Sequence, residues 1–335
     1  MQDSLNQTGW QKTFPSAEDG WRAAYRFRPY LANAPEYELQ DRLTYILRNL
    51  LTITPEGKIS LSKDEHGRKY WLQKLTHLNL ELWRRNKPPI NPTNFPDMIP
   101  FGEKELVLSK TNSEFIKYTK IRPVFARYDD APYAQRLKQQ GELRIKPASA
   151  FSDVTLDHAR HDNELSLEVI TAPCDYDLGL VGSDTRLRFP ERQWLRYSCK
   201  KPSDFYIYCL TTSFDFRYFE DFSMRPPVTP ACVLIRDQKK FEHLIIAAAQ
   251  RELPDWKIKF GPARYIEPYS LGERISWAGE DIYFFKHHRY MYQREYRLIC
   301  IPPSPVFDTL QPKILTLGSL EDITELLTPK VSPTA

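Results

Sequence analysis

Glycine is scarce in this sequence, with only 12 among 335 residues. No Gly-x-Gly-x-x-Gly and no Gly-x-x-x-x-Gly-Lys motif occurs. These are the motifs whose backbone cradles phosphates in dinucleotide-binding and P-loop proteins. A nucleotide ligand would therefore have to be held by side chains.

Paired cysteines and long apolar runs are also missing. The five cysteines, at 174, 199, 209, 232 and 300, include no Cys-x-x-Cys pair, which favours free thiols in a reducing compartment over a disulfide framework or a zinc site. No apolar run approaches the roughly 18 residues of a membrane helix, and the N-terminus lacks a basic-then-apolar signal pattern. We expect no membrane association and a cytoplasmic location, unless a partner machine exports the chain.

An excess of charge of one sign is missing as well. Lysine and arginine number 47 against 43 aspartates and glutamates, a formal net charge of +4. This mildly basic balance tolerates an anionic partner but is far from the concentrated charge of a dedicated nucleic-acid-binding protein.

Helical periodicity fills residues 16–86, where apolar residues recur at spacings of three and four. The repeats are Trp21, Ala24 and Tyr25; then Leu39, Leu43, Ile46, Leu47 and Leu50; then Trp71, Leu75, Leu78 and Leu82. We predict a helical module over residues 1–87. It is either a recognition or autoinhibitory module, which would give a regulatory partner its surface, or a helical cap that completes a core.

Prolines then separate this module from the rest of the chain. Residues 88–112 hold prolines at 88, 89, 92, 96 and 100, which forbid a helix and favour an extended connector. We place the domain boundary there.

Residues 113–335 change to short strands with a few helices. Strands are predicted at 125–128, 142–146, 205–212, 257–260, 263–266, 281–285 and 295–301, and helices at 133–140 and 239–251. The order predicts a mixed α+β domain with antiparallel neighbours rather than alternating βα units.

Three stretches of this domain carry side chains that together suit a nucleotide. Arg127 lies on the first strand, Thr211, Thr212 and Ser213 end a central strand, and Gln293 and Glu295 stand at the start of the last strand. An arginine can neutralise phosphates, hydroxyls can orient a ribose, and a carboxylate can act on the sugar. We expect Glu295 at a strand edge, fixed on a rigid element but open to a ligand.

The order of these stretches resembles a known family. Val124 to Asp129 followed by Gly141-Glu142-Leu143, then Tyr208 to Ser213, then Gln293-Arg294-Glu295, resemble the Arg, Ser-Thr-Ser and Gln-x-Glu series of mono-ADP-ribosyltransferases of the cholera-toxin-like class. Thr211 stands in place of the first serine. The chain also resembles an uncharacterised bacterial domain family linked with phage defence, through its opening aromatic-Arg-Tyr strand, the turn from Pro147 to Asp153, and Glu295-Tyr296-Arg297.

This resemblance implies a split-sheet ADP-ribosyltransferase-like domain that uses NAD as a substrate. Glu295 would stabilise the ribosyl cation and Gln293 would position the acceptor, while Arg127, Tyr128 and the hydroxyl residues 211–213 would hold NAD. The acceptor would be a macromolecule, protein or nucleic acid, and the protein a bacterial toxin or antiphage effector. An antitoxin would then be a fitting partner for the N-terminal helices.

Other interpretations of the same residues stay open. Glu295 beside Arg294 and Arg297 fits a surface ion pair on an edge strand, Arg127 fits a rim charge, and residues 211–213 fit a plain turn. The domain is alternatively a non-enzymatic ligand-sensing module. A third possibility is a metal-dependent nuclease using the acidic and histidine side chains of residues 153–164, although we expect that segment to be a solvated loop and predict no metal site.

Overall fold

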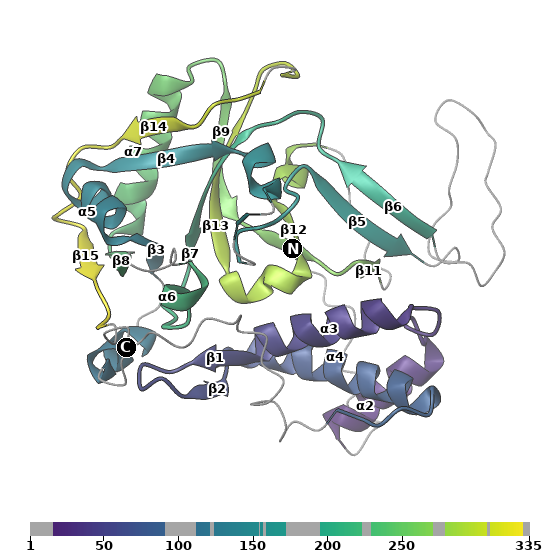
Figure 1. Ribbon diagram of the computed structural model, residues 1–335. Helices are drawn as coiled ribbons and strands as arrows, with labels where there is room; N and C mark the ends of the chain where they lie inside the picture. The colour runs from purple at the N-terminus through teal and green to yellow at the C-terminus, as the bar shows by residue number, and fades with distance from the viewer. Residues whose placement is uncertain are drawn as a thin grey trace. The chain divides into compact units, whose positions relative to one another are not determined.

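The computed structural model describes residues 16–90, 112–120, 124–153, 155–156, 159–171, 195–222, 229–270, 279–306 and 309–330. The chain divides into two compact units. The first consists of Met1–Thr52 and Ile59–Lys104, and the second consists of Ile53–Lys58 and Glu105–Ala335. Figure 1 draws the helices of the first unit in purple to blue and the second unit in teal to yellow. Residues 91–111 of the predicted connector lie outside the described ranges.

The first unit contains the three predicted helices, α2 (Ala17–Phe27), α3 (Glu36–Leu50) and α4 (Glu65–Arg84). The Ser16 side chain caps α2 by accepting from the Asp19 amide, which satisfies one of the free donors of the first turn. The helices bury the apolar stripes that the periodicity predicted, including Leu39, Ile46, Leu47, Leu50, Trp71, Leu75 and Leu78. A short hairpin between α3 and α4, β1 (Leu51–Ile53) with β2 (Ile59–Leu61), was not predicted.

The second unit is mixed α+β, as predicted. Its strands are β3 (Phe125–Asp130), β4 (Glu142–Pro147), β5 (Ser166–Thr171), β6 (Leu195–Lys200), β7 (Tyr206–Thr211), β8 (Pro230–Ile235), β9 (Lys257–Pro262), β10 (Arg264–Ile266), β11 (Tyr269–Ser270), β12 (Phe285–His287), β13 (Glu295–Ile301), β14 (Lys313–Thr316) and β15 (Thr324–Leu327). Its helices are α5 (Ala131–Gln140), α6 (Tyr218–Asp221) and α7 (Gln238–Glu252), with 3₁₀ helices η2 (Ser113–Lys120), η3 (Ala148–Ser152), η5 (Glu280–Phe284) and η6 (His288–Gln293).

The main sheet is antiparallel throughout and splits at its middle. Its strand order is β14-β4-β7-β3-β8-β15, and β13 pairs with both β7 and β9. One edge of β7 pairs with β13 over six residues, whereas the other edge pairs with β4 near its start and with β3 only at Thr211. β4 and β3 therefore diverge along β7. Figure 1 labels these three strands and the helix α5, which contacts both β3 and β4.

Strand alternation gives each side of this sheet its own apolar cluster. One cluster joins the sheet to α5 and α7 and includes Phe125, Tyr208 and Leu298. The opposite side carries two further clusters, one around Phe214 and Phe219 and one around Ile207, Phe284 and Ile299. α5 ends at Gly141 in the left-handed conformation, where a Cβ would lie 2.0 Å from the Gly318 carbonyl oxygen, so this turn requires glycine.

The sequence pattern missed several elements of the second unit. Strands β5, β6, β8, β11, β14 and β15 and helix α6 were not predicted. The strand predicted at 281–285 is wrong over most of its length, because residues 280–284 form the 3₁₀ helix η5 and only Phe285 begins a strand. Ile282, Tyr283 and Phe284 are all buried, so a helical turn surrounded by apolar atoms gave the same apolar run as a buried strand.

Within the described ranges, no helix combines the length and apolar character that crossing a membrane requires.

Candidate active site

Glu295 opens strand β13, and two cations hold its carboxylate. Oε1 lies 2.6 Å from Nζ of Lys286, and Oε2 accepts from Arg297 at 2.7 Å. The Glu295 amide donates to the hydroxyl of Tyr265 at 2.8 Å, and the parallel pairing of β10 with β12 places Tyr265 beside Lys286. Glu295 is 8% exposed, so three strands fix it in a largely buried position.

Two more carboxylates and a lysine complete a buried network of charges. Arg297 donates two hydrogen bonds to Glu164, at 2.8 and 3.0 Å. Nζ of Lys286 lies 3.5 Å from Glu164 and 3.9 Å from Asp162, and Nζ of Lys201 lies 3.8 Å from Glu164. We call these side chains the Glu295 network: Asp162, Glu164, Lys201, Lys286, Glu295 and Arg297.

The network keeps Glu295 ionised at neutral pH. Burial pushes the pKa of Glu295 upward, but the charges of Arg297 and Lys286 outweigh burial and hold the pKa below its usual value. The same balance lowers the pKa of Glu164 to about 2. Burial lowers the pKa of Lys201 to about 8, and burial together with the charge of Glu164 raises the pKa of Asp162.

Gln293 approaches Glu295 through a strained turn rather than along a strand. It ends η6, and Arg294 then takes φ +46°, a left-handed conformation that costs a non-glycine residue about 1 kcal/mol. Gln293 and Glu295 therefore do not lie along one extended strand. Gln293 is 1% exposed; its Nε2 donates to the Ala159 carbonyl at 2.7 Å, and its Oε1 has no hydrogen-bond partner in the described part of the chain.

The hydroxyl residues at the end of β7 lie beside this turn. Thr211 is the register partner of Glu295. Its Oγ1 lies 3.2 Å from the Ser213 carbonyl oxygen and 3.4 Å from the Ser213 amide, so it closes a local turn. The amide and hydroxyl of Thr212 both donate to the Arg294 carbonyl, at 3.0 and 3.2 Å, and thereby tie the two segments together.

Arg127 comes from the other side of the sheet. Its neighbour Ala126 pairs with Thr211, which in turn pairs with Glu295, so strand alternation directs the Arg127 side chain away from the face that carries Glu295. The guanidinium lies at the split, where it donates to the Cys209 carbonyl at 2.9 Å and stands 4.7 Å from the Tyr208 ring centroid.

Tyr128, a predicted NAD-binding residue, is buried in the core. Its hydroxyl donates to the Asp215 carbonyl and accepts from the Asp215 amide, each at 3.0 Å. Rings of Tyr218 and Phe219 pack edge-on against it at 5.2 Å. The Tyr128 side chain therefore packs in the core and forms hydrogen bonds there.

The structure thus brings together part of the predicted site. Residues 211–213, Gln293 and Glu295 adjoin one another, while Arg127 stands on the far side of β7. The expected strand edge and the alternative of a surface ion pair are both wrong for Glu295, because β13 lies between β7 and β9 and the ion pairs are buried.

Lys286, Lys201 and Glu164 were not predicted as members of this site. Lys286 follows four buried apolar residues, Ile282 to Phe285, and a lysine in that position signals a buried ion pair. Glu295 and Arg297 carry a second signal, since opposite charges two residues apart on a strand face the same side.

The segment 153–164 is not the solvated loop that was predicted. Asp153 is exposed, but Asp162 and Glu164 are 8% and 4% exposed and belong to the Glu295 network. Residues 157 and 158 lie outside the described ranges. In the described part of the chain, no group of three or more His, Cys, Asp or Glu side chains is arranged to hold a metal ion.

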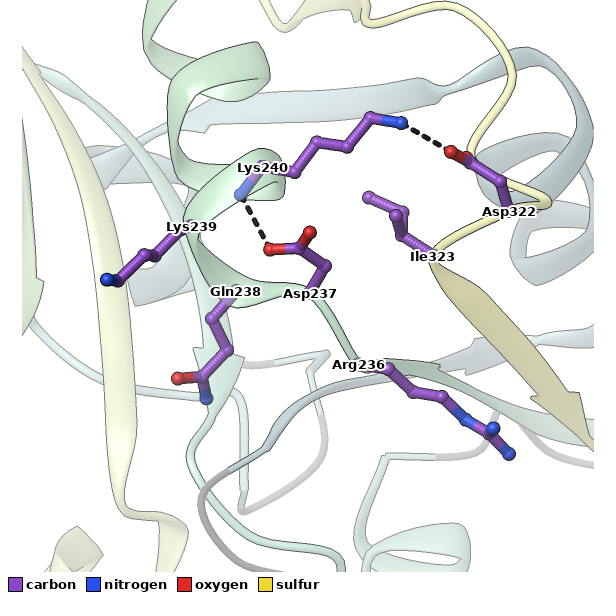
Figure 2. Close-up of a pocket in the computed structure, with 7 residues that line it drawn as sticks. All are labelled: Arg236, Asp237, Gln238, Lys239, Lys240, Asp322 and Ile323. Carbon is purple, nitrogen blue, oxygen red and sulfur yellow. Dashed lines mark hydrogen bonds and ion pairs between the residues drawn. The ribbon is translucent and has the colours of Figure 1, made fainter.

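An open hollow lies elsewhere, at the N-terminal end of α7 (Figure 2). Lys240 bridges it, with its amide donating to Asp237 at 2.9 Å and its ammonium group paired with Asp322. The remaining lining residues are Arg236, Gln238, Lys239 and Ile323, and no predicted site residue is among them.

Comparisons of the chain with protein-family models, curated proteins and solved structures found no match.

Proposed function

We propose that the second unit is an NAD-dependent ADP-ribosyltransferase in which Glu295 is the catalytic carboxylate. The observation that carries the proposal is the placement of ionised Glu295 opposite Thr211, which ends β7, the strand that borders the split in the sheet. Hydroxyl groups and an ionised carboxylate on one face of the sheet are elements that NAD cleavage at the ribose needs.

The reaction breaks the bond between the nicotinamide nitrogen and C1′ of the ribose. The bonding electrons leave with nicotinamide, which departs neutral and needs no general acid, and positive charge develops on the ribose. A fixed carboxylate stabilises this charge only as it appears, which is how a catalyst lowers a barrier. The acceptor then forms a bond to C1′ and loses its proton to solvent.

The network allows Glu295 to turn to a substrate without stranding a cation. Arg297 keeps its two hydrogen bonds to Glu164 when it releases Glu295. Lys286 retains Glu164 and Asp162 within 4.0 Å. Breaking a buried pair is costly when it leaves a charge uncompensated, and here each cation has a second partner.

Arg127 does not share this site. Its side chain lies on the face of the sheet opposite Glu295 and pairs with Asp129 at 2.9 Å, so side chains on the Glu295 face would have to hold the NAD phosphates.

Gln293 offers a hydrogen-bond acceptor to the site. Its buried Oε1 has no partner in the described residues, and leaving a buried acceptor unpaired costs about 1–3 kcal/mol. A donor N–H on a bound substrate or acceptor macromolecule would recover that cost. The biological setting that goes with this chemistry is a bacterial toxin or antiphage effector, with a protein or nucleic acid as acceptor.

A second candidate is a non-enzymatic ligand-sensing module. The observation that favours it is the complete pairing of Glu295, whose two oxygens are both engaged by cations at 8% exposure. In that case the network would only hold β12, β13 and the segment around Glu164 together.

Release of nicotinamide from labelled NAD by the full chain separates these candidates. We expect Glu295→Gln to bind NAD but to lose release by a factor on the order of 10³, because the amide keeps the size and hydrogen bonding but lacks the charge. Glu325→Gln, a matched change of a glutamate outside the network, should release nicotinamide at the wild-type rate. Equal release by wild type and Glu295→Gln would overturn the transferase proposal, and NAD binding without release by wild type would favour the sensing module.

A further inference from the structure

One end of the helical unit gathers the ends of all three helices. The Tyr25 hydroxyl donates to Glu81 at 2.7 Å and the His77 ring contacts the Trp21 carbonyl at 3.1 Å, so α2 and α4 run in the same direction. Lys87, just beyond α4, pairs with Glu36 at the start of α3 at 2.5 Å. The end of α2, the start of α3 and the end of α4 therefore meet.

The connecting loop is fastened to the same end. Arg85 donates to the carbonyls of Leu31 and Ala34 at 2.9 and 2.7 Å, and Arg84 donates to the Ala32 carbonyl at 3.0 Å. These bonds satisfy carbonyls of a loop that forms no regular structure. We call residues 26–38 with 81–87 the aromatic-basic end.

Three large aromatic rings project from this end into solvent. Phe27 is 89% exposed, Trp83 71% and Tyr37 60%, and each belongs to a different helix. The described residues contain four large aromatic side chains that are this exposed, and the fourth, Tyr133, lies in the second unit. Exposed aromatic side chains gathered in one place indicate a binding surface.

Positive charge accompanies the rings. The aromatic-basic end contains five basic and three acidic residues. One of the acidic residues, Glu81, is fully buried and pairs with Arg84 and Arg85, so it offsets part of this charge, while 51% of the Arg84 side chain stays exposed. Arg26 is exposed directly beside Phe27.

This combination fits a single-stranded nucleic acid better than a protein. Bases stack on exposed aromatic rings while nearby cations hold the phosphates, and stacking is worth about 1–3 kcal/mol per base. The centres of protein interfaces, by contrast, are depleted of charged residues. Here Arg26 adjoins Phe27 and Arg84 adjoins Trp83 in the sequence, so a cation stands next to two of the rings.

We infer that the aromatic-basic end of the helical unit binds single-stranded nucleic acid, with bases stacked on Phe27, Tyr37 and Trp83 and phosphates at the adjoining arginines. This function is separate from the proposed transferase activity and does not depend on it. It gives the helical unit the recognition role that its sequence left open.

The test is fluorescence anisotropy of labelled single-stranded DNA and RNA of about 12 nucleotides, a length within the range of known single-strand sites, titrated with the full chain at low salt. Trp83→Ala, Phe27→Ala and Tyr37→Ala should each weaken binding about 5- to 100-fold. Tyr133→Ala, the matched exposed aromatic of the other unit, should leave it unchanged. Binding should also fall steeply between about 50 and 200 mM salt.

Several outcomes would overturn the inference. These outcomes are wild-type affinity in all three ring variants, no binding by the wild type at low salt, and a loss of binding in Tyr133→Ala as large as that in Trp83→Ala. Glu295→Gln distinguishes this inference from the proposed function, because it should bind the oligonucleotide normally, whereas Trp83→Ala should release nicotinamide normally.

Discussion

Each unit of this protein buries a glutamate against two cations, Glu81 in the helical unit and Glu295 in the second, and the two arrangements differ in where the cations come from. Glu81 in the helical unit is fully buried and pairs with Arg84 and Arg85, its neighbours on the same helix three and four residues away. Glu295 pairs with Arg297 on its own strand and with Lys286 on another, and Arg297 joins it to Glu164, which is 133 residues from Arg297 in sequence.

This difference indicates a different role for each glutamate. The Glu81 arrangement forms wherever α4 forms, and its arginines reach out to fasten the loop before α3, which is a structural task. The Glu295 network assembles only when distant segments have folded, and it desolvates more charges at a higher cost. Such a costly arrangement is expected where an ionised carboxylate must be held in one place for chemistry.

Removing the central arginine of each arrangement should show the difference in size. Arg297→Met leaves Glu164 and Glu295 without their shared partner, and we expect a loss of about 3–5 kcal/mol in the free energy of unfolding. Arg85→Met leaves Arg84 on Glu81 and should cost only about 1–2 kcal/mol. Urea unfolding of the full chain followed by circular dichroism measures both, and equal losses would erase the distinction.

Acid should weaken the Glu295 network over a defined window. The pKa of Glu164 is about 2 in the folded protein and 4.5 is its ordinary value, and the pKa of Glu295 is lowered as well. Carboxylates with lowered pKa stabilise the fold above their ordinary pKa and lose that contribution as pH falls towards the folded pKa. We expect about 3 kcal/mol to be lost between roughly pH 5 and pH 2 through Glu164.

Glu164→Gln is the control for this pH dependence, since its amide does not titrate. Its urea midpoint should decline less steeply than that of wild type over the same window. An unchanged slope would show that other carboxylates cause the acid loss.

The smallest expected effect concerns backbone strain. Each unit has one described non-glycine residue with positive φ, Asn86 at 56° and Arg294 at 46°. Comparing alanine with glycine at each position isolates the backbone, and glycine should be more stable by about 1 kcal/mol at both. Asn86→Gly should raise the stability of the wild type less than Arg294→Gly does, because asparagine tolerates this conformation better than arginine. Thermal unfolding of the single variants measures the order, and a larger gain at position 86 would contradict it.

Local patterns predicted the elements but not the network. The helices of residues 16–86 and strands such as β7 and β13 follow from periodicity and β-branched runs within a few residues. The polar segment that contains β5 and β6 gave no such signal. Burial of Glu164 depends on cations more than 30 residues away in sequence, which no local pattern reports. The turn at Arg294 also went unseen, because an arginine gives no sign of a left-handed backbone.

The same limits applied to the predicted NAD site. Arg127, Thr211 and Glu295 lie on neighbouring strands of the sheet. Which face each side chain takes depends on register, and the pairing of Ala126 with Thr211 sends Arg127 to the other side. A one-residue shift in that register would have reversed the outcome, so only the folded sheet decides it.

The most direct test of the distinction between the two glutamates is to measure unfolding free energy and nicotinamide release on the same preparations of Glu81→Gln and Glu295→Gln. The account predicts that Glu81→Gln loses stability but releases nicotinamide at the wild-type rate per folded molecule, whereas Glu295→Gln stays folded, still binds NAD and loses release by a factor on the order of 10³. Release by folded Glu295→Gln at the wild-type rate would contradict it.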